Sequence, residues 1–336
     1  MSTTDTPAEP ALLEAARAAA GRLDAETRRD FCVVVPAWNE AEMIPELVRE
    51  LKAAFARYDL HGEVVLVDDG STDGTGDLAE REATGWEALR VVRHPLNLGK
   101  TEAMVTGTEA TSRRSIILFD ADLQHLPDEI PRFLEALQAG WGIVTGRKVG
   151  SYEKEGISRV YNALSRRLFD IPVSDMNSMK AFRRNALLEL HLRHDWHRYF
   201  VVLAHARGWS VTEIDITLFP RRAGVSKFTG PWRVVVGLLD LLSVGFLLRF
   251  SAKPLMLFGS LGALLVGTGT VVGIVALWLR FGLGFGFRPF LYLVILLVTV
   301  GVLLIGVGFL AEMVAQLRGE ISDLRRQLLR GGGGEG

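Results

Sequence analysis

Hydrophobic residues along this chain form short β-rich runs in the first part and two long uncharged stretches in the last third. The short runs cover residues 31–38, 63–69, 89–94, 115–122 and 142–147, and polar residues follow each of them. Segments with a helical pattern lie between the runs, for example 40–58 and 74–84. This alternation predicts an α/β domain with a mostly parallel sheet covered on both faces. In such sheets, ligands bind beyond the carboxyl ends of the strands.

The two uncharged stretches, Pro254–Leu279 and Pro289–Ala311, contain 26 and 23 residues. A helix needs about 20 apolar residues to cross the hydrocarbon core of a bilayer. Uncharged runs of this length are rare in the core helices of soluble proteins, so membrane spans are the preferred interpretation. The short connector at 280–288 predicts a helical hairpin whose outer ends lie on the same side of the membrane.

Basic residues indicate the orientation of this hairpin. They flank its outer ends at Arg233, Arg249, Lys253, Arg318, Arg325, Arg326 and Arg330, whereas the connector carries only Arg280 and Arg288. Because basic loops stay in the cytoplasm, we expect a two-span inner-membrane protein with both termini on the cytoplasmic side. The first 30 residues have no apolar core, so no signal peptide is predicted.

These features divide the chain into five segments: an N-terminal extension (1–30), the α/β domain (31–230), interfacial amphipathic helices (231–252), the hairpin (253–312) and a C-terminal helix with a flexible tail (313–336). Within the extension, residues 11–28 form either a surface helix or a frayed segment. The C-terminal segment carries apolar residues at helical spacing among charges, which suits a helix on the membrane surface or a partner helix. Those residues are Met313, Leu317, Ile321, Leu324 and Leu328.

Composition narrows the class of protein further. The 336 residues include 38 basic and 39 acidic side chains, so no global basic surface attracts nucleic acid. Cys32 is the only cysteine, which excludes a disulfide within the chain. A hydrophobic content of 49% excludes wholesale disorder.

Two acidic turns at strand ends carry the candidate chemistry. Asp120 and Asp122 flank Ala121, with Gln124 two residues later, and Mg²⁺ binds such a site through one or two carboxylates while water and phosphate complete its shell. Isolated pairs of this kind are also typical of caps and solvated turns. Neither GxxxxGK[ST] nor GxGxxG follows any of the β-rich runs, so a metal at an acidic strand end is the alternative way to hold a nucleotide diphosphate.

The second turn covers residues 67–75. We expect Ser71, Thr72 or Asp73 to cap the helix that follows. Asp68 and Asp69 lie at the strand end itself, where they are better placed to accept hydrogen bonds from a ligand.

Six segments occur in an order and spacing that resemble one family: VVVPAWNE (33–40), VDDGSTDGT (67–75), HPLNLGK (94–100), DADLQHLPDEI (120–130), VTGRK (144–148) and RRAGVSKF (221–228). The sequence resembles inverting GT-A glycosyltransferases of family 2. Within them it is most similar to polyprenol-phosphate glycosyltransferases, namely dolichol-phosphate mannose synthase and the bacterial membrane-anchored enzymes that load undecaprenyl phosphate with one sugar. The resemblance covers residues 31–230.

The resemblance implies a GT-A nucleotide-diphospho-sugar transferase fold and a set of donor-binding residues. The residues implied to bind the nucleotide sugar are Pro36, Trp38, Glu40, Val67, Asp69, Asp120, Ala121, Asp122, Gln124, Arg221 and Lys227. Among them, Asp120, Asp122 and Gln124 are implied to bind Mg²⁺ or Mn²⁺.

Arginines and one further acid complete the implied site. Arg147, Arg159 and Arg198 are the expected contacts of the acceptor phosphate, and Asp122, Asp175, Arg147, Arg221 and Lys227 are the expected catalytic residues. Gly224 gives the loop between Arg221 and Lys227 freedom to close. Asp175 matches imperfectly, since Ser178-Met179-Lys180 replaces a Ser-Gly-Phe type segment. A phosphate monoester has a second pKa of about 6, so this chemistry scarcely needs a base.

The resulting hypothesis is transfer of one sugar from a GDP-mannose or UDP-hexose type donor to polyprenyl phosphate at the cytoplasmic face of the membrane. The product would serve later glycan or glycoprotein assembly, and the transmembrane and C-terminal helices would suit a homo-oligomer. Two alternatives stay open. One is a processive polysaccharide synthase, although the Gln-x-x-Arg-Trp motif of such enzymes is not found. The other is an inactive membrane scaffold with the same fold.

Overall fold

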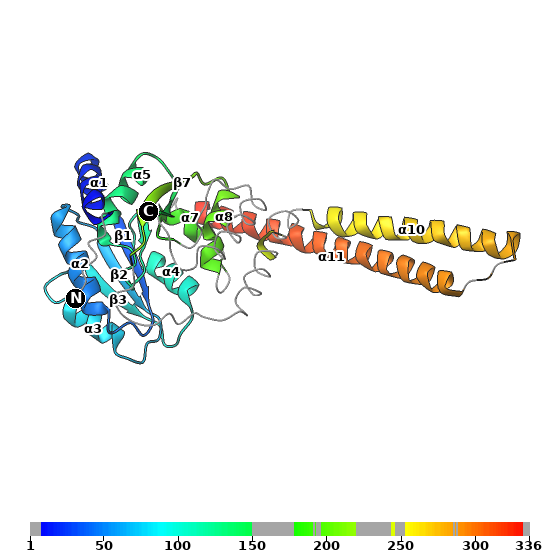
Figure 1. The fold of residues 1–336 in the computed structure, drawn as a ribbon, viewed down its shortest axis with the longest axis horizontal. Helices are drawn as coiled ribbons and strands as arrows, with labels where there is room; N and C mark the ends of the chain where they lie inside the picture. Colours follow the sequence, from blue (N-terminus) through cyan, green and yellow to red (C-terminus); the bar gives the residue numbers. More distant parts are fainter. Residues whose placement is uncertain are drawn as a thin grey trace. The chain divides into compact units, whose positions relative to one another are not determined.

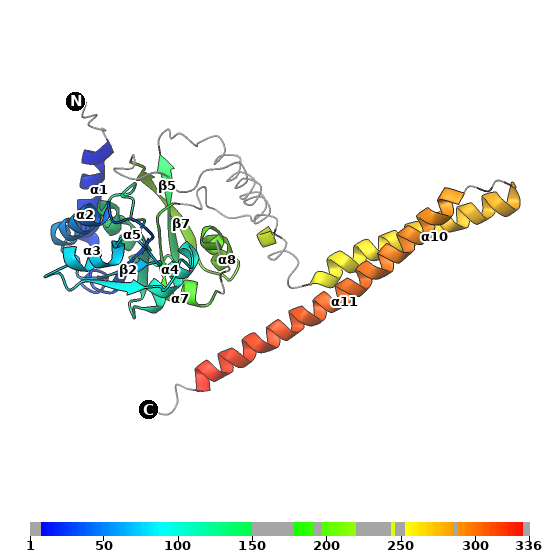
Figure 2. The same cartoon turned by 90° about the horizontal axis from the view of Figure 1, so that it is seen from below.

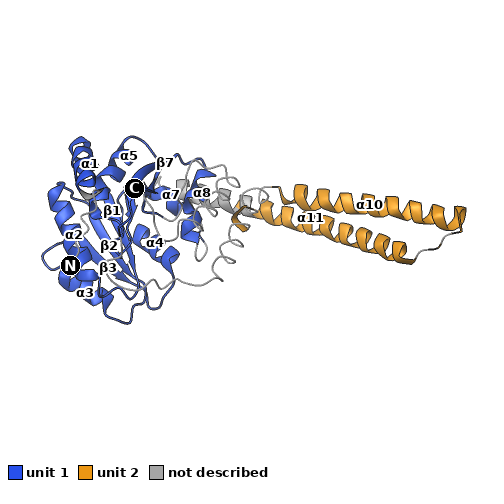
Figure 3. Ribbon diagram, in the orientation of Figure 1, with its two compact units in different colours: residues 1–233 blue, residues 234–336 orange. Residues whose placement is uncertain are grey.

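A computed structural model describes residues 8–149, 178–190, 192, 196–219, 243–245, 253–284, 286 and 288–331. The chain divides into two compact units, residues 1–233 and 234–336 (Figure 3). Of the expected interfacial segment 231–252, only residues 243–245 lie among the described residues, and these are helical.

The first unit is built on a seven-stranded sheet in the order β3-β2-β1-β4-β6-β5-β7 (Figure 1). The strands are β1 (Phe31–Ala37), β2 (Glu63–Asp68), β3 (Leu89–Arg93), β4 (Ser115–Leu118), β5 (Ile143–Val149), β6 (Lys180–Arg183) and β7 (Val211–Thr217). All neighbouring pairs are parallel except those of β6, which is antiparallel to both β4 and β5. The predicted mostly parallel α/β sheet is confirmed. β6 and β7 were not expected.

Helices cover both faces of this sheet. They are α1 (Ala8–Arg22), α2 (Ile44–Arg57), α3 (Thr75–Glu82), α4 (Lys100–Glu109), α5 (Ile130–Gln138), α7 (Arg184–Leu188) and α8 (Phe200–His205), with 3₁₀ turns at η1 (Pro127–Glu129) and η2 (Trp196–Tyr199). Val33 and Val35 of β1 join α2 in the main core, whereas Val34 points to the other face, toward α4. A Cβ on Gly107 of α4 would lie 2.3 Å from Val34, so glycine permits this close approach.

Helix α1 decides between the two interpretations of the N-terminal extension. Leu12 and Ala16 of this helix are buried, and the Arg22 guanidinium donates a 2.9 Å hydrogen bond to Glu135 of α5. The side chain of Gln138 also accepts the backbone N–H of Asp24 at 2.9 Å. Residues 8–22 of the extension are therefore a helix packed on the domain rather than a frayed segment.

The second unit contains the predicted hairpin, formed by α10 (Pro254–Gly282) and α11 (Arg288–Gly331), which run side by side (Figure 2). Pro254–Gly282 and Arg288–Leu317 are long and apolar enough to cross a membrane. Only 11% of the most apolar window of each helix is buried, whereas a soluble core helix would be mostly buried. The structure therefore favours membrane spans over core helices.

Close backbone contact and one polar cap fix how α10 packs against α11. A Cβ on Gly301 would lie 2.7 Å from the carbonyl oxygen of Gly262, so these two glycines bring the backbones together. At the open end of the hairpin, the Glu312 carboxylate accepts the N–H of Leu255 at 3.1 Å. That N–H lies in the first turn of α10, where no intrahelical acceptor exists.

Gly301→Ala should destabilise the hairpin, because the added methyl group meets backbone that cannot yield. Overpacking of this kind costs about 1–3 kcal/mol. Gly306→Ala is the matched control on the same helix, since no described atom lies within 4 Å of the Cβ that it would add. Thermal unfolding in detergent, followed by circular dichroism, should show a lower Tm for Gly301→Ala alone. Equal Tm values for the two variants would contradict this packing.

Candidate active site

The chemistry-bearing residues of the first unit gather at one edge of the sheet. β1, β2, β4 and β5 run parallel and end at this edge, whereas the antiparallel β6 begins there. The topology therefore brings together Trp38 after β1, Asp69 after β2, Asp120 after β4, Arg147 near the end of β5 and Lys180 at the start of β6. The structure therefore places these expected site residues at the carboxyl ends of the parallel strands, where ligands bind in such sheets, and their roles stay predictions.

The carboxylate of Asp69 organises the segment after β3. This side chain is buried and accepts the N–H groups of Leu98 at 2.9 Å and Gly99 at 2.8 Å. It also hydrogen-bonds the imidazole of His94 at 2.7 Å. Gly99 has φ +91°, a left-handed conformation that glycine adopts without strain, and α4 begins at the next residue, Lys100. The hydrogen bonds of Asp69 therefore fix the backbone directly before Lys100, the first residue of α4.

Lys100 forms an ion pair with Asp120. Burial of Asp120 opposes ionisation of its carboxyl group, but Lys100, together with His125 and Lys180, outweighs that effect and holds the pKa of Asp120 below its usual range. Lys100 is the last residue of the segment 94–100, which contributes to the family resemblance, but no role was predicted for it. Its only signal was a lysine directly after the glycine that begins a helix.

His197 of η2 lies in the same cluster. Its backbone N–H donates to the hydroxyl oxygen of Thr101 at 3.2 Å, and its Nδ1 lies 3.2 Å from that oxygen. Burial, followed by the positive charges of Lys100, Lys180 and Arg198, lowers the pKa of His197 well below its usual range. The imidazole is therefore neutral at neutral pH.

Two further cations approach this cluster. The ammonium of Lys180, which is almost fully buried, donates to the carbonyl oxygen of Ser178 at 2.9 Å. Among the residues that the structure describes, no hydrogen-bond acceptor reaches the buried Nε of Arg198. An unsatisfied guanidinium N–H is costly, so an anionic ligand would stabilise Arg198. The sequence did not indicate that Lys180 belongs to this site, apart from its place in the imperfectly matched segment Ser178-Met179-Lys180.

Asp122 and Gln124 follow Asp120 in a tight turn. Asp122 is nearly buried, and its carboxylate accepts the N–H of Gln124 at 3.2 Å. The residue between them, Leu123, has φ +50°. The carbonyl oxygen of Gln124 accepts the N–H of Phe219 at 2.9 Å, which places the segment after β7 beside this turn.

The expected donor-binding loops after β1 and β2 are joined by hydrogen bonds. The N–H of Asn39 donates to the hydroxyl of Ser71 at 2.9 Å, and the side-chain oxygen of Asn39 accepts the N–H of Thr72 at 2.8 Å. The N–H of Glu40 donates to the hydroxyl of Thr75 at 2.9 Å. Trp38, directly before these contacts, is 37% exposed. Pro36 and Val67 lie opposite each other in the β1–β2 register.

Of the three residues expected to cap the helix after β2, Asp73 accepts the first N–H of that helix, although it does not occupy the N-cap position. Gly74 occupies the N-cap position of α3 with φ +83° and provides no side chain. Asp73 instead accepts the N–H of Thr75 at 3.0 Å and that of Ala41 at 3.0 Å. Ser71 and Thr72 bind the Asn39 loop described above, because a glycine in the left-handed conformation redirects the chain before the helix begins.

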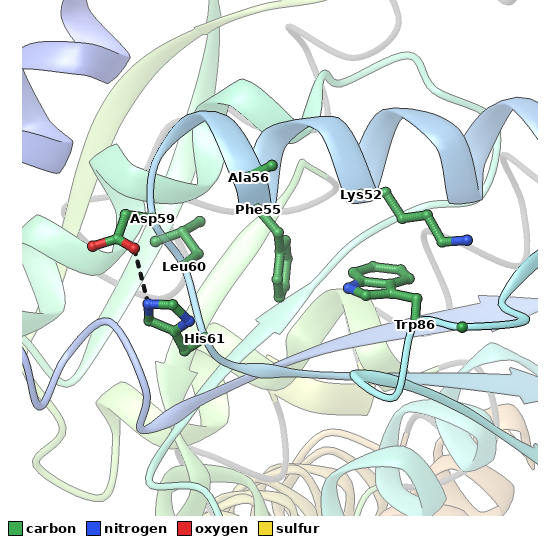
Figure 4. A pocket seen from close by; sticks show the side chains of 8 residues that line it. Lys52, Phe55, Ala56, Asp59, Leu60, His61 and Trp86 are labelled. Atoms are coloured by element: carbon green, nitrogen blue, oxygen red, sulfur yellow. Dashed lines mark hydrogen bonds and ion pairs between the residues drawn. The ribbon is translucent and has the colours of Figure 1, made fainter.

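The structure also contains two surface cavities, at opposite edges of the sheet. A cavity of about 330 Å³ lies at the carboxyl edge, and its lining includes Asp68, Thr72 and Arg93. The other, of about 430 Å³, lies beside the amino ends of β2 and β3 (Figure 4). Its side chains are engaged with one another, for example Lys52 5.8 Å from the Trp86 ring centre. None of the expected donor-binding residues lines either cavity, although Asp68 and Gly70, which flank Asp69, line the first one.

Arg147 and the other expected arginines have different surroundings. Arg147 donates to the Asp215 carboxylate of β7 at 2.6 Å, and both side chains are about half exposed. This hydrogen bond lowers the pKa of Asp215. Four of the expected site residues lie outside the described residues: Arg159, Asp175, Arg221 and Lys227.

Among the described residues, no group of three His, Cys, Asp or Glu side chains is arranged to hold a metal ion. Asp120, Asp122 and Gln124 nevertheless supply the oxygen donors that Mg²⁺ and Mn²⁺ prefer, and two protein carboxylates suffice where phosphate and water complete the shell. The donor set therefore fits such an ion when a diphosphate is also bound.

Comparison with known proteins extends these observations. Residues 32–205 match the family described as Glycosyl transferase family 2. The chain is 34% identical over 304 residues to dodecaprenyl-phosphate galacturonate synthase of Rhizobium johnstonii, covering 85% of this chain and 88% of that protein. It is 29% identical over 303 residues to undecaprenyl-phosphate 4-deoxy-4-formamido-L-arabinose transferase of Pseudomonas fluorescens, covering 86% of each.

Solved structures share the fold. Glucosyl-3-phosphoglycerate synthase of Mycobacterium tuberculosis, in complex with Mg²⁺ and uridine diphosphate, matches with a TM-score of 0.53 and 20% identity, over 69% of this chain and 83% of that one. A complex of the same enzyme with Mn²⁺, uridine diphosphate and glucosyl-3-phosphoglycerate gives a TM-score of 0.52. These matches confirm the predicted GT-A type of fold.

The lowered pKa of His197 predicts a specific pH dependence of stability. Between the folded pKa and the ordinary value of about 6.5, the unfolded state binds a proton that the folded state does not. Stability should therefore fall as the pH drops below about 6.5, by at most about 1.4 kcal/mol per pH unit from this group.

Thermal unfolding at pH 7.5, 6.5 and 5.5 tests this expectation. His197→Gln should show a smaller acid-side loss of Tm than the wild type. His61→Gln, at an exposed ring, is the control and should keep the wild-type profile. Identical profiles for wild type and His197→Gln would show that His197 does not carry this dependence.

Proposed function

This chain belongs to glycosyl transferase family 2, and on that basis we propose that it transfers one sugar from a nucleotide-sugar donor to a polyprenyl phosphate. The observation that carries the acceptor is the similarity to dodecaprenyl- and undecaprenyl-phosphate transferases over 85–86% of the chain, well beyond residues 32–205. The apolar hairpin supports the same conclusion, because the tail of such an acceptor lies in the membrane.

The donor binds, in this proposal, across the carboxyl edge of the sheet. The loops at Trp38–Glu40 and 71–75 receive the nucleoside, together with Pro36, Val67 and Asp69. Asp69 is already hydrogen-bonded to the segment 94–99, so it acts mainly by shaping the cavity. Ala121, between the two aspartates, belongs to the same proposed set, and its side chain packs in the hydrophobic core.

Asp120, Asp122 and Gln124 would hold a Mg²⁺ or Mn²⁺ ion with the donor diphosphate. The ion would supply positive charge that offsets the charge of the leaving nucleoside diphosphate. Lys100 contributes in the same sense, because its ammonium lies at Asp120 and can move to a phosphate oxygen when the carboxylate binds a cation.

The reaction itself is a displacement at the anomeric carbon. An oxygen of the acceptor phosphate forms a bond to that carbon while the bond to the donor diphosphate breaks on the opposite side, so the configuration inverts. The nucleoside diphosphate takes the electron pair. Because the acceptor is largely a dianion at pH 7, no proton transfer is required, and Asp175 would orient groups rather than act as a base.

Two anionic substrates must meet in this site, so cations are needed around the acceptor phosphate. Arg198 offers a buried Nε for which the described residues provide no acceptor. Arg147 stands at the end of β5, and Arg159 belongs to the same proposed set. Arg221 lies outside the described residues and belongs to the same proposed set. Lys227 would complete the closing loop.

The membrane arrangement completes the proposal. The excess of basic residues at the outer ends of the hairpin supports an inner-membrane protein with two spans and with the α/β domain and both termini in the cytoplasm. In this arrangement the α/β domain would meet its nucleotide-sugar donor in the cytoplasm. The acceptor phosphate would lie at the same face of the membrane. The expected homo-oligomer is a separate proposal.

The central experiment incubates the purified full-length protein with polyprenyl phosphate and a panel of sugar nucleotides, and then measures the mass of the lipid product. One added sugar per lipid from one donor is the expected result. A product carrying many sugars would instead support the processive synthase, and inactivity with every donor would support the scaffold alternative.

Removal of either aspartate charge should abolish most of this activity. Asp120→Asn and Asp122→Asn should each lower kcat by about a hundredfold or more, since a charge-stabilising group is lost from the site. EDTA should inactivate the wild type, and added Mg²⁺ or Mn²⁺ should restore it. Asp59→Asn, at the opposite edge of the sheet, is the matched control. Full turnover in EDTA would end the metal proposal.

Arg147 and Asp215 allow a test that separates phosphate binding from structural support. Arg147→Ala should lower kcat/KM for polyprenyl phosphate by about tenfold to a thousandfold. Asp215→Asn breaks the same ion pair but retains the cation, and exposed pairs contribute only about 0–1 kcal/mol to stability. It should therefore leave kcat/KM close to that of the wild type. Equal losses in both variants would show that the pair serves structure alone.

A further inference from the structure

Helix α11 is much longer than a membrane span requires. It runs without interruption from Arg288 to Gly331, or 44 residues (Figure 2). At 1.5 Å per residue its length is about 66 Å, whereas the hydrocarbon core is about 30 Å thick. The uncharged stretch ends at Ala311 and the candidate span at Leu317, and residues 318–331 extend about 21 Å further as the same helix. A continuous helix projects away from the bilayer, which favours the partner-helix interpretation over a helix lying on the surface.

A heptad repeat runs through this helix and past the end of the span. The d positions are all leucine: Leu296, Leu303, Leu310, Leu317 and Leu324. The a positions are mostly β-branched: Val300, Val307, Val314 and Ile321, followed by Leu328. Five consecutive leucines at seven-residue spacing, alternating with valine or isoleucine, form the pattern of a parallel two-stranded coiled coil.

The hairpin leaves this repeat uncovered. α10 packs on the opposite face of α11, where Val294, Val298, Gly301, Ile305 and Gly308 provide its contacts. The a and d side chains from Leu296 to Leu317 are instead all among the exposed large hydrophobic residues, with 37–65% of each exposed. α11 therefore has two apolar faces, one for α10 and one without a partner among the described residues.

We propose that the a/d face of α11 binds the same face of α11 in a second copy of this chain, forming a parallel dimer. Two copies inserted in one membrane with the same topology can only present this helix in parallel. Valine or isoleucine at a with leucine at d selects two strands over three or four. Left-handed crossing of about 20° is also the common geometry of helices within membranes.

Charge complementarity beyond the span supports this choice of partner. In a parallel pair, position g of one helix lies beside position e of the next heptad of its partner. Glu320 occupies g and Arg325 occupies the following e position. A symmetric dimer thus forms two Glu320–Arg325 pairs, one on each side of the apolar seam.

The two parts of the helix contribute differently. Within lipid, exposed leucine and valine gain little from association because lipid tails are equally apolar, so only close packing favours the pair. Beyond the span, the repeat continues with the apolar residues Ile321, Leu324 and Leu328, whose burial in the proposed dimer would drive association in water. Such a short coiled coil is marginal in free solution, but confinement of both copies to one membrane raises their effective concentration.

Disulfide crosslinking of the full-length protein in liposomes tests the dimer directly. Cys32 is fully buried in β1, so the wild type provides a silent background. Leu324→Cys, at d, should give a disulfide-linked dimer under mild oxidation, since Cα atoms must lie about 4.4–6.8 Å apart. Arg326→Cys, at the outward f position, should give at least about tenfold less. Equal yields at both positions, or a higher yield at Arg326→Cys, would overturn the proposal.

A charge exchange in the Leu324→Cys background tests the register. Glu320→Arg places two arginines side by side and should reduce the dimer yield, and additional Arg325→Glu should restore it. Asp323→Arg makes the same charge change at position c and should leave the yield unchanged. Equal loss in Glu320→Arg and Asp323→Arg would contradict the register. No substrate enters these measurements, so their outcome is independent of the sugar-transfer proposal.

Discussion

The buried carboxylate of Asp69 constrains most of the candidate active site. A carboxylate taken out of water is costly unless donors surround it, and here the backbone N–H groups of Leu98 and Gly99 and the ring of His94 meet that need. These bonds hold the segment that ends at Gly99, and α4 begins directly after it. Lys100 consequently reaches Asp120, which follows β4. One satisfied buried group thus connects β2, β3, α4 and β4.

The charge distribution around Asp120 follows from this arrangement. Lys100 and Lys180 surround a single carboxylate, and the neighbouring His197 stays neutral because burial and these same cations disfavour a further positive charge. Cations close to Asp120 suit a site for two phosphate-bearing substrates, since each anion repels the other. The family membership of the chain and this local electrostatics therefore agree.

The second unit follows a different physical rule. In lipid, apolar surface gives no preference for one contact over another. Close packing of the helices and hydrogen bonds to their backbone groups therefore decide how they pair. Gly262 and Gly301 allow close approach, and Glu312 accepts an N–H that α10 cannot satisfy internally. With α10 held on one face, the heptad face of α11 stays available for another copy of the chain.

The sequence by itself determined the elements whose signals are local. Strands β1–β5, the hairpin and the acidic turn at Asp120 could all be predicted, because hydrophobic period, run length and residue type are properties of neighbouring residues. β6 escaped prediction, since its four residues include Lys180 and carry no alternation. Only the tertiary structure decided the partners of the site: Lys100 meets Asp120 across 20 residues and Thr101 meets His197 across 96. Such contacts depend on strand order and on the antiparallel insertion of β6, which arise from packing of the whole sheet rather than from any one segment.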